Sequence, residues 1–135
     1  MKVFVKNGTI VSAGEQYQGD ICIEDGVISQ IGKDLDILAK EGVQVVDAAG
    51  KYVLPGGVDV HTHMDLQAGA SRAVDDFYDG TVAAACGGTT SIVDHMAFGP
   101  AGCPLHYQLN EYHGLADKKA VVDYGFHGTC QHVNS

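Results

Sequence analysis

Two histidines separated by a single residue are the side chains in this sequence best suited to chemistry. The segment VDVHTHMD, residues 58–65, places His61 and His63 where a short apolar run ends. In a strand, residues i and i+2 point to the same face, with side chains roughly 6–7 Å apart. Two imidazoles at that separation can converge on one metal ion, about 2.0–2.1 Å from each nitrogen. The pair therefore predicts half of a metal site. The alternative is two loop-end histidines bonded to backbone or water.

The elements that position this pair begin after Pro55-Gly56-Gly57, where strand and helix patterns start to alternate. A continuous apolar run over residues 58–61 predicts a strand buried on both faces. The β-α-β-α-β order predicts parallel strands with helical crossovers, and reactive groups of parallel barrels lie at the carboxyl ends of the strands. The elements predicted after the first strand are a helix from Asp75 or Asp76 to about Cys86, a strand over 89–94, a helix from Pro104 with an apolar stripe at Leu105, Leu109, Tyr112 and Ala116, and a strand over 120–126.

The first 54 residues predict a separate small β unit, rich in short strands and turn signals. Asn-Gly and Asp-Gly between apolar runs are typical of type I′ hairpin turns. The predicted elements are strands over 3–5 and 9–11 joined by Asn7-Gly8, strands over 20–24 and 27–28 joined by Asp25-Gly26, one or two helical turns over 33–40, and strands over 43–47 and 51–54.

Composition excludes several classes of function. The net charge of -9, with Arg72 as the single arginine, disfavours nucleic acid as a partner. No apolar run approaches the roughly 18 residues of a membrane-spanning helix, so no membrane partner is expected. The four cysteines form no CxxC pair and are typical of reduced thiols, which predicts a cytoplasmic protein.

The length of 135 residues is too short for a closed (β/α)₈ barrel, which takes about 250 residues. Three strands and two helices make up less than half of such a barrel, and no helix is predicted after the third strand. We therefore expect the chain to be the N-terminal piece of a larger protein.

Several stretches carry a resemblance to a known family. The segments NGTIV, DICIEDGVISQIG, VVDAAGKYVLPGGVDVHTH and DDFYDGTVAAACGGTTSIVDH resemble the start of the cyclic amidohydrolases of the D-hydantoinase and dihydropyrimidinase family. The stretch DHMAFGPAGCPLHYQL is most similar to the phenylhydantoinase type. The resemblance implies an α/β fold, the start of the TIM (β/α)₈ barrel of a metal-dependent hydrolase after a small β-sandwich domain. Both would be incomplete here, with residues 1–54 in the β domain and 55–135 in the barrel.

The resemblance also implies an activity. Such an enzyme hydrolyses the cyclic amide bond of hydantoins or dihydropyrimidines with a metal-bound hydroxide, using two divalent metals, usually Zn²⁺. His61 and His63 would bind one metal. A bridging carboxylated Lys, two more His and a proton-shuttling Asp would lie on later strands, so no catalytic residue is expected within this chain. The chain alone would be inactive, and the whole protein would be a homotetramer acting on a small cyclic amide or imide.

Other residues near the predicted strand ends allow two interpretations each. His95 and His127 could line the barrel mouth or be ordinary loop-end histidines, and Asp65 could orient a metal-binding His or be solvated. In the loop over 64–72, Leu66, together with Met64 and Ala68, could present an apolar wall to the substrate, as the matching hydantoinase loop does; otherwise the loop is mobile surface.

Two other functions remain open at this stage. One is a non-catalytic, dihydropyrimidinase-related assembly protein, against which the presence of both His61 and His63 speaks. The other is a dihydroorotase-like amidohydrolase. Such enzymes place a basic residue soon after the His pair, whereas the next basic residue here is Arg72, nine positions after His63.

Overall fold

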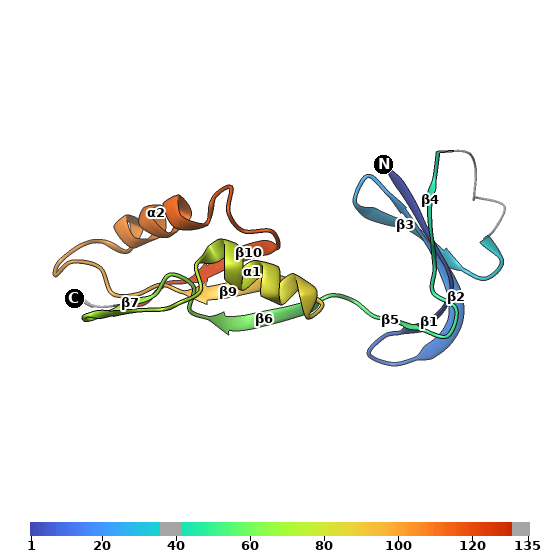
Figure 1. Ribbon diagram of the computed structural model, residues 1–135, viewed down its shortest axis with the longest axis horizontal. Helices are drawn as coiled ribbons and strands as arrows, with labels where there is room; N and C mark the ends of the chain where they lie inside the picture. The colour runs from blue at the N-terminus through green and yellow to red at the C-terminus, as the bar shows by residue number, and fades with distance from the viewer. Residues whose placement is uncertain (36–41, 131–135) are drawn as a thin grey trace. The chain divides into compact units, whose positions relative to one another are not determined.

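The computed structural model of the chain describes residues 1–35 and 42–130, and these form two compact units. The first unit is Met1–Pro55 and the second begins at Gly56 (Figure 1). The helical turns predicted over 33–40 fall mostly outside the described residues. No helix in the described part of the chain combines the length and apolar character needed to cross a membrane.

The first unit is a sheet in which β1 is the central strand. Strands β2 and β3 pair in antiparallel fashion, β2 on β1 and β3 on β2, whereas β4 and β5 pair with β1 in parallel. Phe4, Cys22 and Leu35 form its buried core. The strands are β1 (Lys2–Val11), β2 (Gln16–Glu24), β3 (Val27–Gly32), β4 (Gln44–Asp47) and β5 (Tyr52–Val53).

The hairpin predicted at Asn7-Gly8 is wrong, because β1 runs straight through this dipeptide. Asn7 has a φ of 62°, but the pairing with β2 only shifts register between Val5 and Gly8, which is a bulge. Gly8 is needed for close approach, since a Cβ there would lie 2.5 Å from Val53 Cγ2. The second signal is confirmed: Asp25 and Gly26 both have positive φ and join β2 to β3.

The second unit is a three-stranded parallel sheet in the order β10-β9-β6, with helical crossovers, as the alternation of elements predicts (Figure 1). A two-stranded hairpin, β7 with β8, forms in the loop after β6, where the sequence predicts none. The elements are β6 (Gly57–Thr62), β7 (Gln67–Ala68), β8 (Ser71–Arg72), α1 (Phe77–Cys86), β9 (Thr89–His95), α2 (Leu105–Ala116) and β10 (Asp123–His127).

Helix α1 begins and ends where its capping residues require. The carboxylate of Asp76 accepts hydrogen bonds from the backbone N–H groups of Tyr78 and Asp79, so Asp76 caps the helix, at the second of the two predicted starting positions. Gly87 is the C-cap, and Gly88 follows with a φ of 87°, the left-handed conformation that glycine adopts without strain.

The core of the second unit joins both helices to β9 and β10. Phe77, Ile92, Met96, Tyr112 and Ala116 are buried together. Leu105, predicted to share the apolar stripe of α2, is instead 46% exposed. The polar side chain buried in α2 is Gln108, whose Nε2 donates to the carbonyl of Ala97.

The strand β6 is not buried on both faces as predicted. Val58 and Val60 are each 60% exposed. The reason is its position: β6 is an outer strand of the described sheet, and the core takes none of its residues from β6.

Candidate functional site

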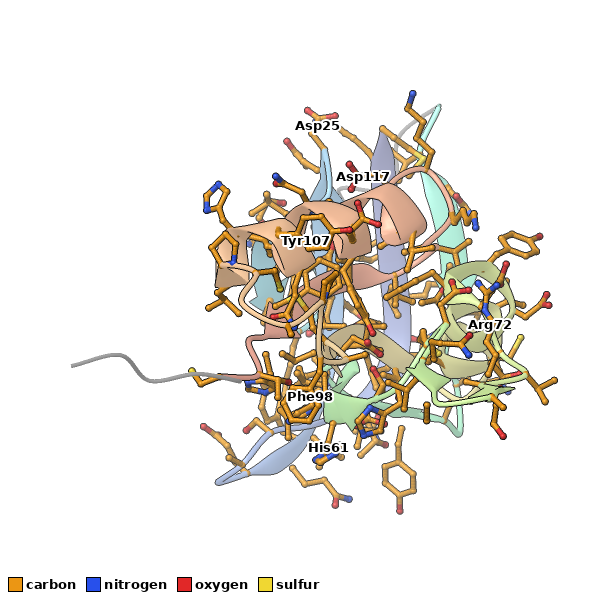
Figure 2. The ribbon with its side chains drawn as sticks, turned by 90° about the vertical axis from the view of Figure 1, so that its left-hand side faces the viewer. Asp25, His61, Arg72, Phe98, Tyr107 and Asp117 are labelled. Atoms are coloured by element: carbon orange, nitrogen blue, oxygen red, sulfur yellow. The ribbon has the colours of Figure 1, made fainter. Side chains whose placement is uncertain are left out.

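Three parallel strands end in histidines on the same edge of the sheet. His61 lies near the end of β6 (Figure 2), His95 ends β9 and His127 ends β10, where it pairs in register with His95. The rings of His61 and His95 stack with centroids 3.8 Å apart, and those of His95 and His127 lie 4.5 Å apart. The structure thus brings both additional histidines beside the His61 and His63 pair.

The ring nitrogens of the histidine pair lie close together. The Nε2 atoms of His61 and His63 are 3.1 Å apart. The pairing of β6 with β9 shifts register between Asp59 and Thr62, so the strand is irregular where the histidines stand. The two rings meet in an edge-to-face arrangement, with centroids 5.0 Å apart.

The same separation suits two ligands of one metal. Two nitrogens on a tetrahedral ion at 2.0–2.1 Å would be about 3.3 Å apart. The observed 3.1 Å is close to that value, and it is also a hydrogen-bond distance for two imidazoles of opposite tautomer. Both histidines are exposed residues. Among residues 1–35 and 42–130, no group of three or more His, Cys, Asp or Glu is placed to hold a metal, so the pair fits only part of a coordination shell.

A buried carboxylate holds the backbone around the pair. Asp94, the next-to-last residue of β9, is fully buried. Its Oδ2 accepts hydrogen bonds from Thr62 Oγ1 and from the backbone N–H of Met64, both 2.7 Å long. Burial raises the pKa of Asp94 and outweighs these two bonds, which lower it.

The sequence analysis assigns no role to Asp94, although its position in the sequence indicates one. An Asp at the end of a predicted buried strand is a polar group that needs a partner. The partners lie about 30 residues earlier in the chain, as the separations of 32 and 30 residues to Thr62 and Met64 show.

The pKa of His95 lies below its usual range. Loss of solvent, followed by the neighbouring His61 and His127, lowers its pKa. The Nδ1 atom of His95 is buried and has no hydrogen-bond partner within the described residues. His127 differs, because its Nε2 lies 3.2 Å from the carbonyl oxygen of Val60 in the opposite outer strand.

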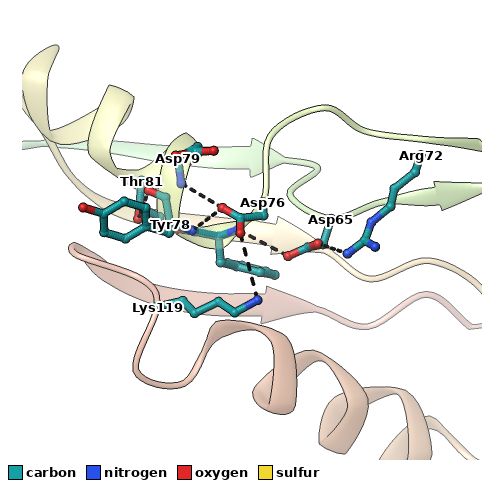
Figure 3. A network of polar contacts seen from close by, with 8 residues as sticks. Asp65, Arg72, Asp76, Tyr78, Asp79, Thr81 and Lys119 are labelled. Atoms are coloured by element: carbon teal, nitrogen blue, oxygen red, sulfur yellow. Dashed lines mark hydrogen bonds and ion pairs between the residues drawn. The ribbon is translucent and has the colours of Figure 1, made fainter.

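Asp65 is not the solvated loop carboxylate of one interpretation. Its side chain is 1% exposed and forms an ion pair with Arg72 (Figure 3). It also accepts a hydrogen bond from the backbone N–H of Phe77, and its own N–H donates to the carbonyl of Asp75. Asp65 therefore ties the β7–β8 hairpin to the start of α1. No hydrogen bond within the described residues joins it to either histidine of the pair.

The loop that carries Leu66 is ordered by these contacts. The carbonyl of Leu66 accepts a hydrogen bond from Ala73, which closes the base of the hairpin. Leu66 is half-buried and Ala68 is exposed, whereas Met64 packs against the hydrophobic core. Met64, Leu66 and Ala68 therefore all stay predictions as parts of the apolar wall. A pocket of about 250 Å³ between this loop and α2 includes Gln67, Phe98 and Tyr107 in its lining but not Leu66.

Comparison with known proteins shows which proteins this chain is similar to. A profile described as the amidohydrolase family matches residues 44–105. The D-phenylhydantoinase of Escherichia coli (strain K12 / DH10B) is 52% identical over 134 residues, which are 99% of this chain and 29% of that protein. The chain thus spans less than a third of the length of this curated relative.

Solved structures show the same similarity. A D-hydantoinase crystal structure has a TM-score of 0.92 and 44% identity, covering 99% of this chain and 28% of the other. The dihydropyrimidinase from Brevibacillus agri NCHU1002 gives the same values. These findings confirm the resemblance to the D-hydantoinase and dihydropyrimidinase family, whose members are cyclic amidohydrolases.

Proposed function

We propose that this chain is the N-terminal part of a metal-dependent cyclic amidohydrolase that opens the ring of hydantoins or dihydropyrimidines. The observation that carries the proposal is the His61 and His63 pair. Its nitrogens lie 3.1 Å apart near the carboxyl end of β6, in a chain 52% identical to D-phenylhydantoinase. On this proposal, β6, β9 and β10 begin a (β/α)₈ barrel and the first unit is part of a β-sandwich domain.

In this function His61 and His63 would bind a divalent metal, with zinc as the expected ion and two ions per site. When bound, such a metal supplies Lewis acidity toward the amide carbonyl and lowers the pKa of water. The chain's own residues hold and orient this half of the site. The remaining ligands and the proton-transfer group would come from later strands. The homotetramer also stays a prediction.

The proposal is tested on the full-length protein that contains this chain, or on a chimaera in which this chain replaces the matching segment of Escherichia coli D-phenylhydantoinase. We call either one the full-length enzyme. We expect it to open an aryl-substituted hydantoin, to lose turnover on removal of metal by a chelator, and to regain it with zinc. Turnover that persists in fully metal-free enzyme would contradict the proposal.

The structure also bears on the two alternatives. A non-catalytic relative has no need for two converging histidines. A dihydroorotase-like enzyme needs a basic group free to hold a substrate carboxylate, but the guanidinium of Arg72 is paired with the buried Asp65. The first observation favours a catalytic site, and the second favours a substrate without a carboxylate.

Leu66 is expected to influence substrate choice. In the full-length enzyme, Leu66→Ala should lower the kcat/KM ratio of aryl-substituted over unsubstituted hydantoin, because lost apolar contact of this kind is worth about 1–3 kcal/mol. Steady-state kinetics on both substrates measure the ratio. Leu54→Ala is the control, since Leu54 is 62% exposed and outside the loop. An unaltered kcat/KM ratio in Leu66→Ala would show that this side chain does not contact the substrate.

Arg72 is expected to stabilise the loop. In Arg72→Ala the buried carboxylate of Asp65 loses its cation, and we expect the free energy of unfolding to fall by about 1–3 kcal/mol. The cost is smaller than for a fully buried pair because Arg72 is 58% exposed. Urea titration measures the free energy of unfolding. Lys119→Ala is the matched control: its contact with Asp76 spans 4.0 Å between exposed groups and should contribute at most about 1 kcal/mol. Equal losses in both variants would contradict this role.

A further inference from the structure

Asp94 occupies the place where regular pairing between β6 and β9 fails. The register shifts between Asp59 and Thr62, and resumes with Thr62 opposite Asp94. An irregular strand end leaves backbone donors without the ladder partners that a regular sheet supplies. The side chain of Asp94 takes over that function for this segment.

Its two hydrogen bonds bracket His63 along the chain. The hydroxyl of Thr62, directly before His63, and the backbone N–H of Met64, directly after it, both donate to Asp94 Oδ2 at 2.7 Å. One oxygen atom on β9 thus fixes both neighbours of His63. Hydrogen bonds to a carboxylate are shorter and stronger than those between neutral groups, so this restraint is a firm one.

The burial of Asp94 is unfavourable for the stability of the fold. Asp94 is fully buried, and its second oxygen, Oδ1, finds no hydrogen-bond partner in residues 1–35 or 42–130. A carboxylate buried in this way costs stability unless its lone pairs are satisfied. A neutral acceptor would satisfy the same two donors at lower cost, which points to a function for the carboxylate.

We propose that Asp94 is a positioning residue: by fixing Thr62 and Met64 it sets the orientation of His63 relative to His61 and so determines the affinity of the pair for a divalent metal. The inference rests on the proposed function for its metal, but it concerns side chains of this chain only. Groups that orient metal ligands change metal affinity by about 10–100-fold when removed.

Another buried carboxylate in the chain serves as a matched control for Asp94. Asp20 in the first unit is also buried, and it also accepts two hydrogen bonds, from the backbone N–H groups of Asn7 and Leu35. Removing it deprives two buried or half-buried donors of their acceptor, as removing Asp94 does. Asp20 belongs to the first unit and the histidines to the second, so Asp20 separates a loss of stability from a loss of metal geometry.

The test measures Co²⁺ binding to the metal-free full-length enzyme, by titration and by the visible absorption spectrum of the bound ion. In Asp94→Ala we expect the Kd for Co²⁺ to rise about 10–100-fold and the spectrum to change. Asp94→Asn keeps one carbonyl oxygen as an acceptor and should recover part of the affinity. Thr62→Val removes one of the two bonds and should give a smaller effect, which keeps the test open if Asp94→Ala does not fold.

For Asp20→Ala we expect a lower Tm with the Kd and spectrum of the unchanged enzyme. The proposal is overturned if Asp94→Ala or, where that variant does not fold, Thr62→Val binds Co²⁺ with unchanged Kd and spectrum. It is also overturned if Asp20→Ala alters both to the same degree. Absence of hydantoin turnover in the unchanged enzyme would instead contradict the proposed function. The comparison of Co²⁺ binding would still decide the role of Asp94.

Discussion

Replacing His61 or His63 with alanine in the full-length enzyme is expected to abolish metal-dependent ring opening. Each variant removes one of the two nitrogens that lie 3.1 Å apart, and with it a direct ligand. A catalytic metal contributes several kcal/mol of transition-state stabilisation, so turnover should fall on the order of 10³-fold or more. Metal content by elemental analysis and kcat on an aryl-substituted hydantoin measure the two losses.

The control for this prediction is His106→Ala, which makes the same chemical change at an exposed position in the first turn of α2. It should keep the metal content and the kcat of the unchanged enzyme. If His61→Ala or His63→Ala retained full metal stoichiometry and activity, the assignment of the pair would be wrong.

The isolated 135-residue chain is expected to show no hydantoin turnover and weak zinc binding. A zinc site normally needs three or four protein ligands, and the described residues supply two converging nitrogens. The chain is also expected to self-associate. Val58 and Val60 on β6 and Val27 and Ile28 on β3 are all more than half exposed, and both strands are outer strands of their sheets.

Size-exclusion chromatography, zinc calorimetry and a ring-opening assay on the same preparation test this expectation together. The control is the full-length enzyme at equal concentration. A monodisperse chain with tight zinc binding and metal-dependent turnover would contradict it, and would require the missing ligands to lie within these residues.

The order of elements in the second unit follows from the sequence because its signals are local. Asp76 before an apolar segment and Gly87-Gly88 after it define α1, and the strands on either side alternate with helices as the parallel pairing requires. The turn at Asp25-Gly26 is local in the same sense. These features depend on neighbours within a few residues.

The features that the sequence did not predict depend on distant contacts. Asn7-Gly8 is a typical hairpin signal, but pairing of β1 with three other strands keeps it within one strand, where it forms only a bulge. The spacing of His61 and His63 indicates a shared face, but it does not predict the irregular pairing of β6 with β9 beside them. Asp65 and Asp94 are each explained by partners that only the folded chain brings near, Arg72 and Thr62 among them.

The most direct test of the central claim is the location of the metal in the zinc-loaded full-length enzyme. Anomalous X-ray diffraction at the zinc edge, on crystals of enzyme shown to be active, locates the ion without reference to kinetics. We expect a zinc peak bonded to Nε2 of both His61 and His63, at about 2.0–2.1 Å from each. Zinc peaks that leave both nitrogens unbound in active crystals would contradict the account.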